Sequence, residues 1–284
     1  MPILRYAAFT DTPDGGNPAG VVLDSDALTA VQMQAIAADL GYAESAFVSG
    51  RSTGAATVHY FAPEAEIPFC GHATIATAVA LAELDGTGPL RLSTPVGVLD
   101  VGTAYDDDGR LIASLATVDP WVQEPDDDVR RELLGSLRLR EADLAQDLPV
   151  LLAFAGNVHP IVPVRDAAVL RGLDYDYGAL KELMDAQGWG ATVAVVHRIG
   201  PMVFEARNPF PPGGVREDPA TGSAAASLGA YLRHLAAVTL PARITVHQGS
   251  SVGRPSIISV DIPAAGGLTV SGGAVSLDAP RTRG

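Results

Sequence analysis

Two long runs of small and apolar residues stand out among the many short hydrophobic segments of this chain. They lie within residues 68–84 and 218–235. Each contains a Gly followed by a polar residue, Gly71-His72 and Gly222-Ser223, and the residues after that are mostly Ala, Thr, Ser and Leu. A surface helix shows a polar face at helical spacing, and these two runs hardly do. We therefore expect two helices that are buried nearly all round.

Short strand-like segments surround both of these runs. In the first half they are residues 3–9, 19–23, 45–48, 57–61, 90–93, 97–101 and 111–115. In the second half they are residues 150–154, 158–164, 192–196, 203–206, 244–248, 257–261, 268–271 and 274–277. Many short strands with one buried helix in each half predict an α+β fold of two small barrels or rolls, each wrapped around a helix.

Amphipathic segments predict further helices at residues 28–40, 129–137 and 179–187, the first of them ended by Gly41. The pattern changes near residues 118–125, which are rich in Pro and acidic residues. We place the boundary between the two lobes there.

Composition narrows the range of partners. The chain has 284 residues, 47% of them hydrophobic, and a formal net charge of −14, which argues against nucleic acid and anionic membranes as partners. A single Cys excludes an internal disulfide and fits a reducing cytoplasm. The first residues do not have the layout of a signal peptide. We expect a soluble cytoplasmic protein with a small anionic ligand, because the N-terminus of a buried helix favours negative charge.

Glu44 is the first candidate for chemistry. It stands between the helix-ending Gly41 and an apolar strand. If the carboxylate is buried, its pKa rises toward the range useful for proton transfer. The alternative is an exposed Glu at the end of a strand, and the residues alone leave both open.

Other candidates lie at the starts of the two buried helices. His72 and Cys70 precede or begin the first, and Asp218, Thr221 and Ser223 lie at the start of the second. Capping and packing roles would explain each of them equally well. The six His show no metal-ligand spacing and the lone Cys has no thiol partner, so we predict no metal.

Five ordered motifs of this chain resemble those of the phenazine-biosynthesis isomerase family, which has a diaminopimelate-epimerase-like fold. The resemblance covers nearly the whole length and is specific for the family rather than for one substrate. The motifs are residues 16–23 (GNPAGVVL), 44–48 (ESAFV), 68–74 (PFCGHAT), 217–225 (EDPATGSAA) and 248–256 (QGSSVGRPS).

The resemblance implies two pseudo-symmetric lobes, each a β-barrel-like sheet around a central helix, with the active site between them. It also implies that the last strand returns to the first lobe. We therefore expect an N-terminal lobe of residues 1–117 plus 265–284 and a C-terminal lobe of residues 118–264. The resemblance also suggests a homodimer.

The family's best-known member isomerises trans-2,3-dihydro-3-hydroxyanthranilate without a cofactor. By resemblance, Glu44 takes a proton from one carbon and returns one to another, and His72, Asp218 and Ser223 complete the catalytic set. We therefore expect a cofactor-independent isomerase acting on a small cyclic carboxylate.

Substrate binding is expected to involve both helix N-termini. Gly71 lies at one of them, and Gly222 and Thr221 lie at the other. Asn17, in the first shared motif, is the fourth residue that we assign to this group.

Two alternatives stay open. Related racemases and epimerases use a Cys at the head of each central helix, and Cys70 matches the first position while Thr221 occupies the second. A hydroxyl cannot replace a thiolate as a base near neutral pH, so this interpretation is disfavoured and Cys70 is left with a packing role. The other alternative is a non-catalytic member of the family that binds a metabolite.

Overall fold

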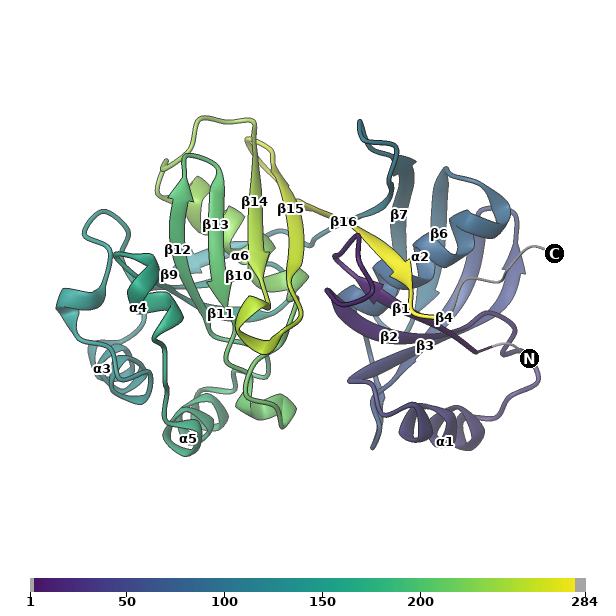
Figure 1. Cartoon of the computed structure of the whole chain (residues 1–284), viewed down its shortest axis with the longest axis horizontal. Coiled ribbons are helices and arrows are strands. Elements are labelled where there is room, and N and C mark those ends of the chain that lie inside the picture. The colour runs from purple at the N-terminus through teal and green to yellow at the C-terminus, as the bar shows by residue number, and fades with distance from the viewer. Residues whose placement is uncertain (1–2, 279–284) are drawn as a thin grey trace. The chain divides into compact units, whose positions relative to one another are not determined.

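The computed structural model describes residues 3–278 (Figure 1). The chain divides into two compact units. Unit 1 extends to Ala116 and resumes at Ser271, and unit 2 comprises Thr117–Val270. Each unit contains one of the two buried helices, α2 (Gly71–Asp85) in unit 1 and α6 (Gly222–His234) in unit 2.

Within the described residues, the remaining elements of unit 1 are one helix and eight strands, with a ninth strand shared with unit 2. They are β1 (Ile3–Ala8), β2 (Asn17–Val22), α1 (Ala30–Leu40), β3 (Glu44–Ser52), β4 (Ala55–Phe61), β5 (Glu66–Ile67), β6 (Pro89–Thr94), β7 (Gly97–Tyr105), β8 (Leu111–Ala116) and the shared β16 (Thr269–Ser276).

Unit 2 contains seven strands of its own, three further α-helices and three short 3₁₀ turns. They are β9 (Trp121–Gln123), α3 (Asp127–Ser136), η1 (Glu141–Asp143), β10 (Leu151–Phe154), β11 (Val158–Pro163), α4 (Ala167–Arg171), α5 (Tyr177–Gln187), β12 (Ala194–Gly200), β13 (Val203–Arg207), η2 (Pro211–Gly213), β14 (Ala242–Gln248), η3 (Ser250–Val252) and β15 (Ser256–Ile262).

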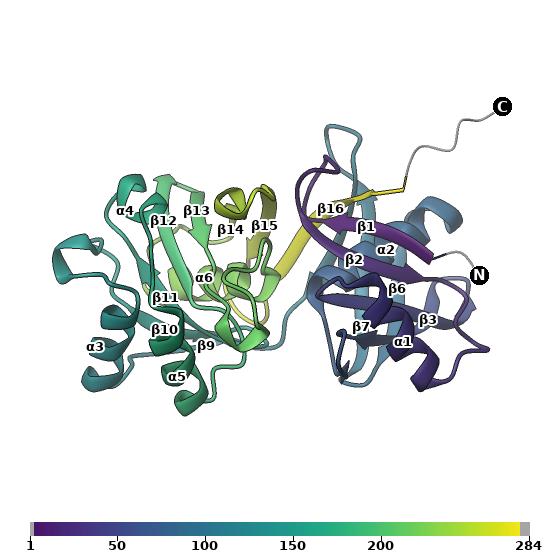
Figure 2. The same cartoon turned by 60° about the horizontal axis from the view of Figure 1, so that its bottom comes forward.

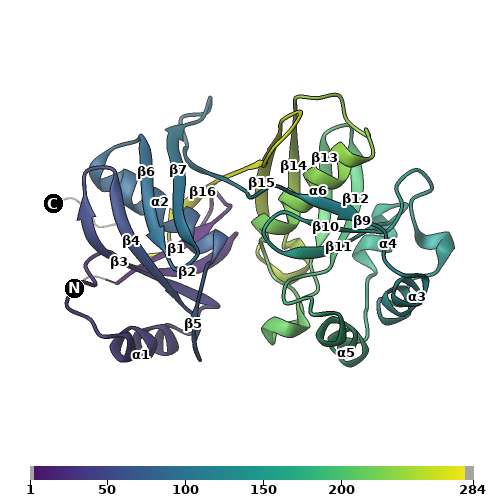
Figure 3. The ribbon, with the colours of Figure 1, turned by 180° about the vertical axis from the view of Figure 1, so that it is seen from behind.

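The strands of unit 1 form a closed barrel. Its order is β1-β2-β3-β4-β6-β7-β8-β16, and β16 pairs antiparallel with β1 to close the ring. Helix α2 contacts β1, β2, β3, β7 and β8, so strands surround it from several sides (Figure 3). The expected α+β class, with a barrel around a central helix, is confirmed.

The same series of strand pairings recurs in unit 2. In unit 1, β2/β3 and β4/β6 are parallel and the β3/β4 pair between them is antiparallel. In unit 2, β11/β12 and β13/β14 are parallel, with the antiparallel β12/β13 between them. In both units the central helix is the crossover between the second parallel pair, as parallel strands require. This shared topology supports an internal duplication.

The small residues of the central helices let strands approach closely on every side. Every residue of α2 from His72 to Ala82 is buried, and so is every residue of α6 from Ala224 to Leu232. A Cβ added to Gly229 of α6 would lie 2.6 Å from a methyl carbon of Leu268 and 3.1 Å from one of Val260. The prediction of two helices buried nearly all round is confirmed.

The peripheral helices α1, α3 and α5 are each buried on one face only. Helix α1 begins with a capping box between Thr29 and Gln32 and ends at Gly41, whose φ of 67° is the left-handed conformation that glycine adopts easily. In unit 2, α3 packs against α5 (Figure 2). No helix within residues 3–278 is both long and apolar enough to cross a membrane.

Two expectations about the elements need correction. Residues 268–271 and 274–277 were expected as separate strands, but most of them belong to the single strand β16, which runs through Gly272 and Gly273, and the Gly273 carbonyl accepts a hydrogen bond from the Phe9 backbone N–H at 2.7 Å. The short elements β5, β9 and α4 were not predicted. They have two, three and five residues, too few for a periodic pattern to show.

Candidate active site

A carboxylate, a thiol and an imidazole meet at the head of α2 in unit 1. Glu44 is the first residue of β3, Cys70 directly precedes α2, and His72 lies in its first turn. Glu44 Oε2 is 3.4 Å from His72 Nε2, and Cys70 Sγ is 3.4 Å from His72 Nδ1. The Cys70 side chain also forms a hydrogen bond with Glu44. Sequence reasoning left Cys70 with a packing role, whereas the structure gives it polar contacts with both candidate residues.

A chain of buried hydroxyls fixes the position of this helix head. The Thr74 hydroxyl donates to the Cys70 carbonyl at 2.7 Å, and the Tyr60 hydroxyl lies 2.7 Å from Thr74 Oγ1. Because the single hydrogen of Thr74 is used toward Cys70, Tyr60 is the donor in the second bond. Strand β4 thereby holds the backbone between Cys70 and His72 in place.

Burial changes the acidity of Glu44. Its side chain is only 21% exposed. Loss of hydration raises the pKa of the carboxyl group, and the hydrogen bond with Cys70 opposes that rise. A carboxylate with a raised pKa is a stronger base than an exposed one, which suits it to remove a proton from carbon.

A second group of candidate residues gathers at the head of α6 in unit 2. The Thr221 hydroxyl donates a hydrogen bond to the Asp218 carboxylate. Gln248, the last residue of β14, accepts a bond from the Thr221 backbone N–H at 3.1 Å and donates to the Asp218 carbonyl at 2.7 Å. Thr221 occupies the N-cap position of α6 but makes no side-chain cap hydrogen bond there.

Ser223 is held by a fully buried histidine. His159 Nε2 lies 2.9 Å from Ser223 Oγ, and His159 Nδ1 lies 2.8 Å from the Thr192 carbonyl. Burial lowers the pKa of His159 to about 4, so the ring is neutral near pH 7. Because a carbonyl can only accept, Nδ1 carries the proton and Nε2 accepts from the Ser223 hydroxyl.

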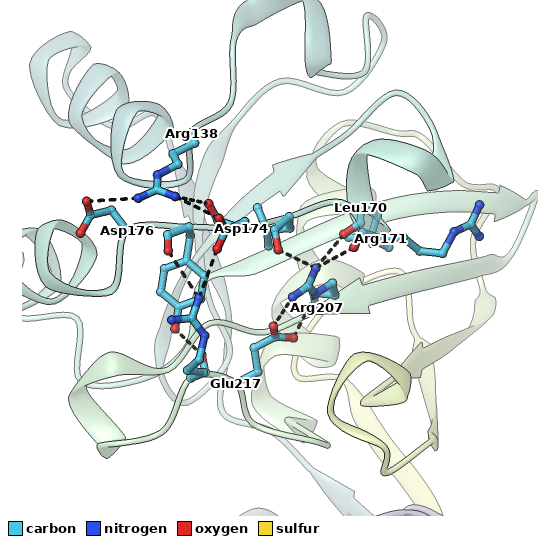
Figure 4. A network of polar contacts seen from close by, with 10 residues as sticks. Arg138, Leu170, Arg171, Asp174, Asp176, Arg207 and Glu217 are labelled. Carbon is cyan, nitrogen blue, oxygen red and sulfur yellow. Dashed lines mark hydrogen bonds and ion pairs between the residues drawn. The ribbon is translucent and has the colours of Figure 1, made fainter.

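The segment before Asp218 is anchored by a buried ion pair (Figure 4). The guanidinium of Arg207 donates to both carboxylate oxygens of Glu217, and the two side chains are 14% and 5% exposed. Arg207 also donates to the carbonyls of Leu170 and Arg171 at 3.2 and 3.1 Å. Ser251 adds a hydrogen bond to Glu217 at 2.9 Å. This network fixes the backbone next to Asp218.

The structure thus brings the candidate residues together in two groups, one in each unit. Glu44 and His72 meet in unit 1, and Asp218, Thr221 and Ser223 lie within one short segment of unit 2. Gly71 and Gly222 are the first residues of their helices.

The structure also places Asn17, and it brings two residues without a predicted role, His159 and Gln248, to the candidate residues of unit 2. Asn17 is buried at the start of β2. Sequence reasoning gave no role to His159 or Gln248, which contact the candidate residues. His159 lies on β11, far from α6 in the chain, and no local pattern marks it, whereas Gln248 is the first residue of the motif at residues 248–256, which was a signal for it.

The family of the chain follows from comparison with known proteins. Residues 6–279 match the family model described as "Phenazine biosynthesis-like protein". The chain belongs to this family, as the resemblance implied.

Curated relatives match over nearly the whole chain. An uncharacterized isomerase from Deinococcus radiodurans is 35% identical over 93% of this chain and 89% of that protein. The trans-2,3-dihydro-3-hydroxyanthranilate isomerase of Pseudomonas chlororaphis is 31% identical over 88% of this chain and 86% of that protein. These relatives are isomerases, and this chain is assigned to the same class of enzyme.

Solved structures of this family and of an epimerase have the same fold as this chain. The phenazine biosynthesis protein of the PhzF family from Bacillus anthracis superposes with a TM-score of 0.87 at 26% identity, covering 97% of this chain and 96% of that one. A hydroxyproline epimerase from Agrobacterium vitis superposes with a TM-score of 0.57 at 16% identity, over 98% and 93% of the two chains. The second likeness extends the fold to epimerases.

Proposed function

We propose that this protein is a cofactor-independent isomerase that moves a proton between two carbons of a small cyclic carboxylate. The observation that carries the proposal is the position of Glu44. It is a partly buried carboxylate with a raised pKa, in contact with Cys70 and His72. A substrate related to trans-2,3-dihydro-3-hydroxyanthranilate is supported by the relative from Pseudomonas chlororaphis that is named for it.

The reaction needs only one shuttled proton. The Glu44 carboxylate removes a proton from a C–H group next to a conjugated system, and the electron pair delocalises into that system. The carboxylic acid then returns a proton to a different carbon, so the product has the same atoms and oxidation level as the substrate. His72, 3.4 Å from Glu44, holds the carboxylate in position and can exchange protons with it.

The heads of the central helices supply binding sites for a negative charge. Gly71 and Gly222 begin these helices, where backbone N–H groups are not used within the helix. Each such terminus contributes about 0.3–1 kcal/mol toward an anion. This local effect allows a substrate carboxylate to bind although the chain as a whole carries a charge of −14. Asn17 and Thr221 are also assigned to binding the substrate.

Ser223 and Asp218 are assigned to the polar groups of the substrate. Because Ser223 donates its hydrogen to His159, its oxygen remains available to accept a hydrogen bond, such as one from an amino or hydroxyl group. Asp218 accepts the hydroxyl hydrogen of Thr221, which orients the carboxylate.

The test is an exchange experiment. Purified protein is incubated with trans-2,3-dihydro-3-hydroxyanthranilate in D₂O and followed by proton NMR. We expect loss of substrate with deuterium entering the product carbon. Glu44→Gln should abolish both while leaving the circular dichroism spectrum unchanged. The matched control is Glu66→Gln, which removes a carboxylate that is 42% exposed and pairs with His59.

The possible outcomes test the identity of the base and the identity of the substrate separately. Near-normal turnover by Glu44→Gln would remove the proposed base. No reaction in the wild type would exclude this substrate and direct the assay to other cyclic amino acids.

The contact between Cys70 and Glu44 gives one reason to keep a racemase or epimerase as a second candidate. A thiol beside a carboxylate at the head of a helix can itself serve as the base. The position matching the second thiol of such enzymes is Thr221, which disfavours a two-thiol mechanism. If Cys70→Ser lost exchange at the α-carbon of an amino acid while Glu44→Gln kept it, the racemase would replace the isomerase.

A further inference from the structure

The group formed by Glu44, Cys70 and His72 holds three kinds of metal-ligating atom. A carboxylate oxygen, a sulfur and an imidazole nitrogen all lie within 4.8 Å of one another. The spacing of His and Cys along the sequence predicts no metal, because the third ligand, Glu44, lies on β3 and only the fold brings it to Cys70 and His72. Oxygen, nitrogen and sulfur donors together suit Zn²⁺, whereas Mg²⁺ and Ca²⁺ prefer oxygen alone.

The separation of Glu44 and His72 is that of two ligands around one tetrahedral ion. With the usual Zn–N, Zn–O and Zn–S bond lengths, an N–O edge of the tetrahedron measures about 3.3 Å and an S–N edge about 3.5 Å. Glu44 Oε2 and His72 Nε2 are 3.4 Å apart, and Cys70 Sγ and His72 Nε2 are 3.9 Å apart. Cys70 Sγ is nearer to His72 Nδ1, at 3.4 Å, so the Cys70 side chain must rotate toward the Nε2 side of the ring for both residues to coordinate one ion.

The charge of the three ligands and their solvent exposure also favour a divalent cation. A Cys thiolate and a Glu carboxylate together neutralise two positive charges, and a neutral imidazole completes the set. Cys70 and His72 are 7% and 8% exposed, so most of the site is shielded from bulk water. Glu44 is 21% exposed, which leaves a route for an ion to enter. Three protein ligands leave a fourth position for water, the layout of an open zinc site.

We propose that Glu44, Cys70 and His72 form a Zn²⁺-binding site that switches off proton transfer. The carboxylate lone pair that takes the proton from the substrate is the one that coordinates the ion. On binding, the ion exchanges water ligands for bonds to Glu44, Cys70 and His72, and the S–H bond of Cys70 breaks with its proton going to solvent. The proposed metal binding does not depend on the proposed function, whereas the inhibition rests on the proposed role of Glu44 as the base.

Binding is tested with Co²⁺ as a spectroscopic probe of the full-length protein. Coordination of a thiolate to Co²⁺ gives an intense near-ultraviolet band that oxygen and nitrogen ligands do not give. We expect one equivalent of Co²⁺ to produce this band and one equivalent of Zn²⁺ to displace it. Cys70→Ser should abolish the band, and His72→Asn and Glu44→Gln should each weaken Zn²⁺ binding at least about tenfold.

The matched control is His59→Asn. His59 and Glu66 form an exposed imidazole–carboxylate pair, 2.7 Å apart, on the same unit. This substitution should leave the Co²⁺ band and the Zn²⁺ affinity unchanged. Absence of the band in the wild type, its persistence in Cys70→Ser, or its loss in His59→Asn would each overturn the site.

Inhibition is measured separately in the D₂O exchange assay. One equivalent of Zn²⁺ should stop turnover, and a chelator should restore it. Zinc that binds at Glu44, Cys70 and His72 without slowing turnover would overturn the switch. If the wild type turns over no substrate, the Co²⁺ spectrum still decides the metal site, so that failure of the isomerase proposal is distinguishable from failure of this one.

Discussion

The Nε2 atom of His159 accepts a hydrogen bond from the hydroxyl of Ser223, 2.9 Å away. His159 lies on β11 and is completely buried, while Ser223 lies in the first turn of α6. The neutral ring therefore fixes the direction of the Ser223 hydrogen. It turns Ser223 from a group that can donate or accept into one that accepts.

We predict that His159 is a positioning residue whose loss affects substrate binding more than the chemical step. His159→Leu removes the acceptor and should lower kcat/KM about two- to tenfold, the effect of one hydrogen bond. Most of the loss should be in KM, because Ser223 is assigned to binding. Steady-state kinetics with the substrate established by the exchange assay measures the split.

The conservative variant His159→Gln serves as the control for this prediction. Its amide oxygen can accept a hydrogen bond from the Ser223 hydroxyl, so it should recover much of the lost kcat/KM. Equal kinetics in His159→Leu and the wild type would show that the contact does not orient Ser223.

The same histidine makes the stability of unit 2 depend on pH. Its pKa is lowered from 6.5 to about 4 in the folded protein. Above pH 6.5 the ring is neutral in both states. As the pH falls toward 4, the unfolded chain takes up a proton that the folded protein does not. The free energy of unfolding should therefore fall by about 3 kcal/mol across this range.

Tryptophan fluorescence measures this effect in the right part of the molecule. The chain has two Trp residues, Trp121 and Trp189, and both lie in unit 2. Urea unfolding followed at several pH values should show the decline in the wild type and a flatter profile in His159→Gln. His59→Asn, in unit 1, should behave like the wild type. An equal slope in His159→Gln and the wild type would contradict the assignment.

Much of the fold could be predicted from the sequence because its strongest signals are local. The runs of small residues around Gly71 and Gly222 identified both central helices, and Gly41 marked the end of α1. Short elements such as α4 and β9 were missed because a few residues show no period. The single strand β16 was divided in two because Gly272 and Gly273 resemble a turn when the neighbouring strands are unknown.

The sequence predicted only some of the residues of the candidate site and none of their contacts. Glu44 and His72 stand in recognisable motifs, but the sequence left their burial open. Cys70 and His159 acquired roles only through the contacts that the fold creates with Glu44 and Ser223, and Gln248, although part of a motif, through its contacts with the head of α6. A residue on a strand carries no sign of which helix head it will meet.

The ion pair between Arg207 and Glu217 is predicted to be essential to unit 2. Arg207→Met leaves the Glu217 carboxylate, 5% exposed, without its cationic partner. Breaking a buried pair in this way costs about 3–5 kcal/mol. Urea unfolding followed by tryptophan fluorescence should show this loss, and kcat/KM should fall because Asp218 follows Glu217 directly.

An exposed pair in the same unit provides the comparison. Arg131 and Asp128 are 73% and 82% exposed, so Arg131→Met should cost no more than about 1 kcal/mol. The double variant Arg207→Met/Glu217→Gln should be more stable than Arg207→Met alone, since it leaves no buried charge. Similar losses for Arg207→Met and Arg131→Met would show that burial adds nothing.

Gly249 and Gly253 offer a final matched pair within one turn after β14. Both have a left-handed backbone, with φ of 82° and 72°. A Cβ on Gly249 would lie 2.2 Å from the Arg254 carbonyl oxygen and 2.5 Å from that of Pro219, whereas one on Gly253 would meet nothing within 4 Å. Gly253→Ala should therefore cost only the backbone strain, about 1–2 kcal/mol.

Gly249→Ala should cost at least about 1–3 kcal/mol more than Gly253→Ala, because two carbonyl groups must move. Pro219 follows Asp218, so Gly249→Ala should also lower kcat/KM while Gly253→Ala leaves it close to the wild-type value. Urea unfolding by tryptophan fluorescence and steady-state kinetics test both halves of the prediction. Equal stability and equal kinetics for the two variants would mean that the approach of Gly249 to Pro219 does not position Asp218.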